Sequence, residues 1–195
     1  MQPLVFSRPI PLPVLKQGGW YDDFIQSSGK NSSYVINGDG IIKATENGIK
    51  LQRGSTTLFL GLPDYFKGNN FEAEIYMRRV TANNLIFAFK ALSPLNLSNR
   101  WLVRFNSSTS DSFDLLKIVD GVTTVMGQKS NVGGTNFHRV NIKVVGSNIS
   151  VGLDGVNMFD INSIDHINNG YFFVTTASTS NGDYSEIGYL VIKPL

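Results

Sequence analysis

Residues Phe137–Gly155 read FHRVNIKVVGSNISVGLDG, and this stretch decides the fold. Apolar and polar residues alternate on both sides of a break at Gly146-Ser147-Asn148, as in strands that bury one face. Asp154-Gly155 supplies a second turn. Short breaks that contain Gly, between alternating segments, predict antiparallel pairing. The inward face of this β-hairpin is expected to hold Val140, Ile142, Val144, Ile149, Val151 and Leu153.

From Ser33 onward the chain is a series of short strand candidates separated by turn residues such as Asn37-Gly38-Asp39-Gly40. One helical turn is expected at most, at Ile161–Ile167. Many strands without helices to cover a parallel sheet predict an all-β fold, a two-layer antiparallel sandwich. Besides the hairpin, strands are expected at Tyr34–Ile36, Ile41–Ala44, Ile49–Arg53, Thr57–Leu60, Phe71–Val80, Leu85–Lys90, Trp101–Phe105, Phe113–Val119, Val122–Gln128, Tyr171–Thr176 and Ile187–Lys193.

The composition is that of one globular domain. Hydrophobic residues make up 42% of the 195 residues and charged residues only 16%, which is enough apolar material for a large core. The net charge of +2 comes without a Lys/Arg run, so nucleic acid is not an expected partner. No stretch approaches the roughly 20 apolar residues of a membrane helix, so no membrane insertion is expected.

The chain has 0 Cys, which favours folding in a reducing compartment. Prolines and Arg8 interrupt the apolar N-terminus, so a secretory signal is not expected there. We therefore expect synthesis and folding in a cytoplasm.

The first residues predict an extended arm. Of the 7 prolines, Pro3, Pro9, Pro11 and Pro13 fall at the start, where they prevent a helix or a central strand. The expected division is an arm at residues 1–18 and a sandwich at residues 19–195. The arm needs a surface to cover its apolar side chains, either its own sandwich edge or, slightly favoured, a neighbouring subunit. Its docking side chains would be Leu4, Phe6, Ile10, Leu12 and Val14.

Four segments carry a resemblance to a known superfamily: YVINGDGIIKATENGIKLQRG (34–54), FEAEIYMRR (71–79), the hairpin, and GYFFVTTASTSNGDYSEIGYLVIKPL (170–195). They resemble the concanavalin A-like lectin/glucanase (laminin G-like) β-sandwich superfamily. The resemblance covers most of Ser33–Leu195 and implies a jelly-roll β-sandwich. Lectins, glycosidases, adhesion modules and virion proteins share these segments, so the resemblance does not transfer a function.

Two carboxylates form the one candidate catalytic pair. Glu72 and Glu74 project from one face of a strand, about 6.5–7 Å apart along the backbone, which suits a glycosidase pair. The resemblance implies an E-x-D-x-E signature for a glucanase, and FEAEIY lacks its middle Asp and third carboxylate. Charged residues that alternate with apolar ones are also the ordinary exterior of a sandwich, which we prefer here. No G-x-S-x-G motif or thiol offers another nucleophile.

Binding candidates lie on loops. Because laminin-G and lectin relatives often hold Ca²⁺, calcium is the one cofactor that the resemblance implies. The oxygens for it would come from Asp111, Asp114, Asp183 and Glu186, although such residues are also ordinary turn residues. Sugar binding calls for aromatic rings beside planar polar groups; the candidates are Tyr65, Phe66, Asn181, Asp183 and Tyr184. Trp101 is assigned to the core.

Taken together, these features predict a non-catalytic structural or binding protein. The apolar arm, the absence of Cys and the polar loops resemble a bacteriophage virion component, such as a tail, baseplate, fibre or capsid-decoration protein. It would be made in the host cytoplasm, form a homo-oligomer, dock through its arm and present its sandwich to surface glycans. The alternatives are a glycoside hydrolase or lyase that uses Glu72 and Glu74, and a free lectin.

Overall fold

The computed structural model describes residues 20–22, 35–62, 70–81, 84–93, 97–107, 111–132, 134–165, 170–177, 180 and 182–195. The arm at residues 1–18 lies outside this part of the chain. Within these ranges the chain forms strands and no helix, so nothing there could cross a membrane as an apolar helix. The strands are β1 (Trp20–Asp22), β2 (Val35–Asn37), β3 (Ile41–Thr45), β4 (Gly48–Gln52), β5 (Leu58–Gly61), β6 (Phe71–Arg79), β7 (Asn84–Ala91), β8 (Arg100–Asn106), β9 (Ser112–Val119), β10 (Val122–Lys129), β11 (His138–Val145), β12 (Asn148–Leu153), β13 (Val156–Asn162), β14 (Tyr171–Ala177) and β15 (Tyr184–Pro194).

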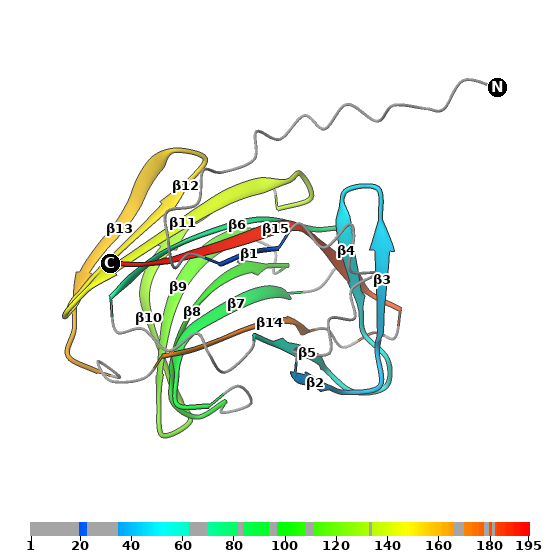
Figure 1. Cartoon of the computed structure of the whole chain (residues 1–195), viewed down its shortest axis with the longest axis horizontal. Helices are drawn as coiled ribbons and strands as arrows, with labels where there is room; N and C mark the ends of the chain where they lie inside the picture. Colours follow the sequence, from blue (N-terminus) through cyan, green and yellow to red (C-terminus); the bar gives the residue numbers. More distant parts are fainter. Residues whose placement is uncertain are drawn as a thin grey trace.

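The strands build two antiparallel sheets. The eight-stranded sheet has the order β13-β12-β11-β6-β15-β4-β3, with β1 paired to β15, and the seven-stranded sheet has the order β10-β9-β8-β7-β14-β5-β2. In Figure 1, β6, β11 and β15 lie along the upper side and β7, β8 and β14 lie below them. The expected all-β, two-layer antiparallel jelly-roll sandwich is therefore confirmed.

The core lies between the two sheets. Strand β6 alternates buried and partly exposed residues along its whole length, with Phe71, Ala73, Ile75 and Met77 inward. The rings of Phe71 and Phe172 meet edge to face at 4.8 Å between centroids. Each such buried ring stabilises the fold by roughly 1.5–3 kcal/mol. Trp101 is fully buried, as expected, and its indole N–H donates to the Asp165 carbonyl at 3.2 Å.

The hairpin that predicts the fold is β11–β12, and its two strands pair antiparallel as expected. Val140 faces Leu153, and its expected inward residues are all buried. The turn that follows has φ of 51° at Asp154 and 83° at Gly155, the conformation of a tight hairpin turn. The chain then continues into β13, which the sequence did not predict because Asn and Asp are poor strand formers. Ile161 and Asn162 end this strand, so the helical turn expected to start at Ile161 was wrong there.

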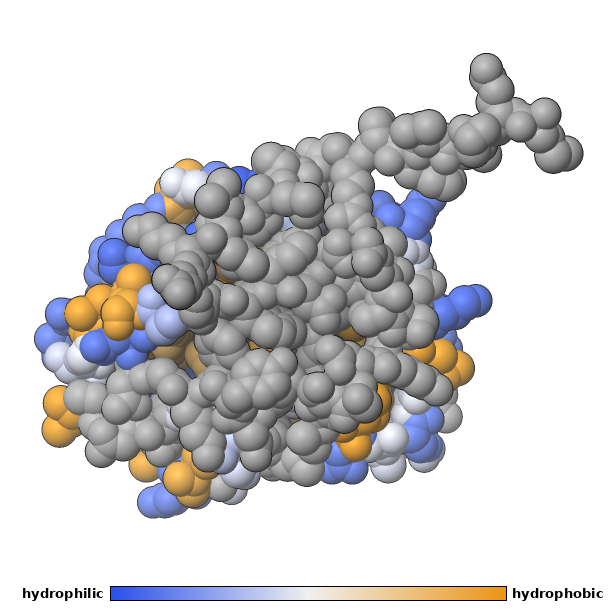
Figure 2. All heavy atoms as spheres, viewed as in Figure 1, coloured by the Kyte–Doolittle hydropathy of each residue, from blue (hydrophilic) through white to orange (hydrophobic). Residues whose placement is uncertain are grey.

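The outer face of the seven-stranded sheet is also apolar. A second buried cluster there includes Ile86, Ala88, Leu102, Leu116 and Phe173. This explains why β7 and β8 read as nearly continuous apolar runs rather than alternating ones. By contrast, the end of the molecule formed by β12 and β13 is mostly hydrophilic, with a few hydrophobic residues between (Figure 2). On β6 the outward residues are Glu72, Glu74, Tyr76 and Arg78, so the eight-stranded sheet has a polar outer face along this strand.

Candidate functional site

A groove of about 340 Å³ lies on the outer face of the eight-stranded sheet, over β6, β11, β12 and β15. Glu72 and Glu74 both line it, so the carboxylate pair of the sequence lies within one site. Its shape follows from the register of the strands, which places outward side chains in three rows across the sheet.

The first row is charged. Ser150, Lys143, Glu72 and Lys193 face one another across β12, β11, β6 and β15. The Lys143 Nζ atom lies 3.0 Å from Glu72 Oε1, and both side chains are about half exposed. Ser150 donates from its hydroxyl to Asp160 on β13 at 2.6 Å. This row forms one wall of the groove.

The middle row forms the hollow. It consists of Gly152, Asn141, Glu74 and Val191, again in register. Gly152 has no side chain and that of Val191 is short, so the space between the outer rows stays open. Glu74 Oε2 accepts from Asn141 Nδ2 at 2.8 Å, and Glu74 Oε1 accepts from the Tyr189 hydroxyl at 2.5 Å.

The third row is aromatic. Arg139, Tyr76 and Tyr189 face one another, and Phe137 stacks on Tyr76. The Phe137 and Tyr76 centroids are 4.6 Å apart, and those of Tyr76 and Tyr189 are 5.5 Å apart, with the planes within 12° of parallel. The Arg78 guanidinium lies 4.6 Å from the Phe137 ring centroid and extends the stack. The third row is thus a stack of parallel rings beside the residues that line the groove.

The charges of the groove balance. Among its titratable lining residues, Glu72 and Glu74 oppose Lys143 and Lys193. A few fixed polar groups beside apolar and aromatic surface are typical of small-molecule sites. The residues that line the groove therefore offer hydrogen bonds to a neutral ligand and carry no excess of either charge.

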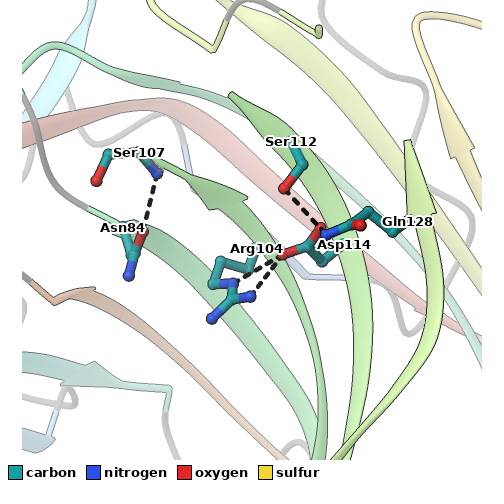
Figure 3. A network of polar contacts seen from close by, with 6 residues as sticks. All are labelled: Asn84, Arg104, Ser107, Ser112, Asp114 and Gln128. Atoms are coloured by element: carbon teal, nitrogen blue, oxygen red, sulfur yellow. Dashed lines mark hydrogen bonds and ion pairs between the residues drawn. The ribbon is translucent and has the colours of Figure 1, made fainter. Parts of the chain in front are cut away.

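Of the four carboxylates that were candidate calcium ligands, three are each paired with an arginine. Asp114 lies within β9, fully buried, and accepts from Arg104 at 2.6 and 3.0 Å and from Gln128 at 3.0 Å (Figure 3). Asp111 pairs with Arg79, and Glu186 lies 2.6 Å from an Arg78 terminal nitrogen.

In the fourth calcium candidate, Asp183, the backbone carbonyl accepts a hydrogen bond from the Arg53 N–H at 2.9 Å. No group of three acidic or histidine side chains that could hold a metal occurs in the described part of the chain.

Of the loop candidates for sugar binding, the structure describes Asp183 and Tyr184. Tyr65, Phe66 and Asn181 lie outside the described residues. Tyr184 begins β15, where the Lys50 Nζ lies 4.0 Å from its ring centroid. Val191, which lines the groove, is seven residues further along, about 23 Å at strand spacing. The structure thus places Tyr184 and the neighbouring Asp183 away from the groove.

Comparison with known proteins identifies the fold. No family model and no curated protein sequence matches this chain. Solved structures match along most of it. One, a protein of unknown function with a galectin-like fold from Bacillus subtilis, has a TM-score of 0.72 and 8% identity and covers 89% of this chain and 94% of its own. The fold is a concanavalin A-like β-sandwich.

Two further solved structures are similar to this chain at low sequence identity. The LamAcat structure from Zobellia galactanivorans has a TM-score of 0.68 and 11% identity over 89% of this chain and 96% of its own. The carbohydrate-binding module CBM66 from Bacillus subtilis has a TM-score of 0.63 and 14% identity over 80% of this chain and 91% of its own. At such identities the likeness extends to the fold alone, so the function has to be argued from the groove.

Proposed function

We propose that this concanavalin A-like sandwich binds a neutral oligosaccharide in the groove of the eight-stranded sheet and does not cleave it. The observation that carries the proposal is the open middle row of the groove, lined by fixed polar groups on neighbouring strands. A sugar ring has a rim of hydroxyl groups, so it matches the carboxylate, amide and ammonium groups there. The binding module among the similar structures adds support.

The contacts of the two carboxylates favour binding over catalysis. A glycosidase needs one carboxyl group that protonates the leaving oxygen and a second that attacks or activates water. Here Glu72 pairs with Lys143, and both oxygens of Glu74 accept hydrogen bonds from protein donors. Both carboxylates therefore serve as fixed acceptors.

Titration of the purified protein with laminaritetraose, Man3GlcNAc and N-acetylglucosamine tests the proposal, since these sugars occur in the names of similar structures. We expect measurable binding of at least one, and at least a tenfold loss in Gly152→Leu. A Cβ at Gly152 would lie 3.3 Å from the Val156 carbonyl oxygen, so the added side chain has to extend into the groove.

Thr123→Ala is the control for Gly152→Leu, because Thr123 is exposed on β10 of the other sheet and its loss should leave binding unchanged. Equal binding by Gly152→Leu and the native protein would place the ligand elsewhere. Release of new reducing ends from laminaritetraose, abolished in Glu74→Gln, would instead establish the glycosidase alternative.

The arm supports a second part of the proposal, that the protein works within a homo-oligomeric assembly. Its apolar side chains, spaced by prolines, suit an extended segment that binds along a neighbouring subunit. A bacteriophage virion, built from proteins made in the host cytoplasm, is the assembly that we propose. The three structures compared above are not named as virion proteins, so the arm alone supports this part.

A further inference from the structure

We infer that Tyr189 is a positioning residue, which holds Glu74 as the fixed acceptor for a sugar hydroxyl in the groove. This inference rests on the proposed function. It begins with an irregularity in β15, where the pairing with β6 shifts between Ile187 and Tyr189.

The irregularity is a β-bulge that changes which residues of β15 face outward. Ile187 pairs with Met77 and points into the core, whereas Tyr189 pairs with Tyr76, only one residue earlier on β6. Without the extra residue, Tyr189 would share the inward face of Ile187, because strand side chains alternate. The bulge therefore places the Tyr189 ring on the outer face, beside Glu74.

Glycine is required at the bulge itself. A Cβ at Gly188 would lie 2.7 Å from Tyr76 Cδ1 and 3.1 Å from the Asn47 carbonyl oxygen. Because Gly188 has no Cβ, the Tyr76 ring can lie over the backbone there and stack on Tyr189. The stack leaves the Tyr189 ring little freedom, which fixes the position of its hydroxyl.

The hydrogen bond between Tyr189 and Glu74 can have only one direction. An ionised carboxylate accepts hydrogen bonds and has no proton to donate. The Tyr189 hydroxyl must therefore donate its own proton to the Glu74 carboxylate, at 2.5 Å. Burial, followed by the bond to Glu74, raises the pKa of Tyr189 well above its ordinary value, so the donor persists at neutral pH.

Glu74 is thus held from two sides, by Tyr189 at one oxygen and by Asn141 at the other. The Arg139 Nε atom also lies 3.5 Å from Glu74 Oε1. A carboxylate has about four acceptor positions, so these three contacts leave at least one for a ligand. The Glu74 side chain is 28% exposed, so a sugar hydroxyl in the groove can reach it. Tyr189 itself is only 1% exposed and acts through Glu74.

Titration of Tyr189→Phe with laminaritetraose tests the inference, because the variant keeps the stacked ring and removes only the hydroxyl. We expect about tenfold weaker binding. In a Glu74→Gln background, Tyr189→Phe should weaken the affinity for laminaritetraose less than twofold. In a Lys143→Ala background it should again weaken the affinity about tenfold. A general structural defect would weaken binding equally in both backgrounds.

Two further measurements separate this inference from the proposed function. A crystal structure of Tyr189→Phe without ligand should show the Glu74 carboxylate turned from its present position, and an unchanged carboxylate would overturn the inference whatever the protein binds. Arg139→Met removes the guanidinium that lies 3.5 Å from Glu74 Oε1 and should weaken binding about threefold. Native affinity in Tyr189→Phe and Arg139→Met, with affinity lost in Glu74→Gln, would reject the positioning role alone. Native affinity in Glu74→Gln and Gly152→Leu would reject the proposed site.

Discussion

Asp39 shows how one exposed carboxylate can join two loops. It lies in the turn between β2 and β3 and accepts from the backbone N–H groups of Ser55 at 2.9 Å and Thr56 at 2.8 Å, and from both hydroxyls. These bonds, that of the Ser55 hydroxyl first, hold the pKa of Asp39 well below its ordinary value. A lowered pKa in the folded state stabilises the fold above about pH 4, where the unfolded chain ionises, and the stabilisation is lost as pH falls further. We therefore expect Asp39→Ala to lower the Tm at pH 7, and the difference from the native protein to narrow at pH 3, both measured by circular dichroism. Glu46→Gln, a change at an exposed carboxylate of the next turn, should leave the Tm at both pH values close to native. Equal Tm values for Asp39→Ala and the native protein at pH 7 would show that this loop contact adds no stability.

At the scale of elements, a buried polar network joins strands β8, β9 and β10. Asp114 on β9 receives Arg104 from β8 and Gln128 from β10 and is fully buried (Figure 3). The sequence predicts a strand at Phe113–Val119, which β9 confirms. Ser-Asp-Ser-Phe-Asp is also typical of turns, so Asp114 was at the same time a candidate ligand in a calcium loop. Removing one partner of a buried pair leaves the other without compensation. Asp114→Ala should therefore destabilise the fold by about 3 kcal/mol in urea unfolding, somewhat less if Arg104, one quarter exposed, can reach water. Glu72→Ala breaks the exposed pair with Lys143 and should cost under about 1 kcal/mol. Similar losses in the two variants would mean that burial does not set the strength of these pairs.

At the scale of the whole molecule, the layers could be predicted and the groove could not. Alternation in Phe71–Arg79 and in the hairpin requires only local pattern, and it correctly placed Glu72 and Glu74 together on an outer face. The groove depends on register between β6 and β11, which lie more than sixty residues apart in sequence, and on the bulge at Gly188. The sequence of the hairpin alone does not indicate a site on its outer face. Asn141 and Lys143 become part of a site only because they contact Glu74 and Glu72 on β6. Complementary charges in FEAEIY and HRVNIK were the one sequence signal that these two strands pair. No sequence signal pointed to Tyr189, because its outward position depends on the bulge at Gly188.

The arm allows a test of the whole assembly. Every described core residue lies between Ile49 and Ile192, so deletion of residues 1–18 should leave the sandwich folded. If the apolar side chains of the arm bind a neighbouring subunit, the deletion should convert the oligomer to monomer in size-exclusion chromatography with light scattering, with a nearly unchanged circular dichroism spectrum. A full-length variant with Leu4, Phe6, Ile10, Leu12 and Val14 changed to Ser keeps the prolines and the length and should dissociate in the same way. An unchanged mass in both variants would assign the arm to the edge of its own sandwich, because an apolar segment that binds no neighbour has to cover its side chains within its own chain. In that case both variants should instead have a lower Tm than the native protein. Mass and Tm together therefore distinguish an arm that binds a neighbouring subunit from one that covers its own sandwich.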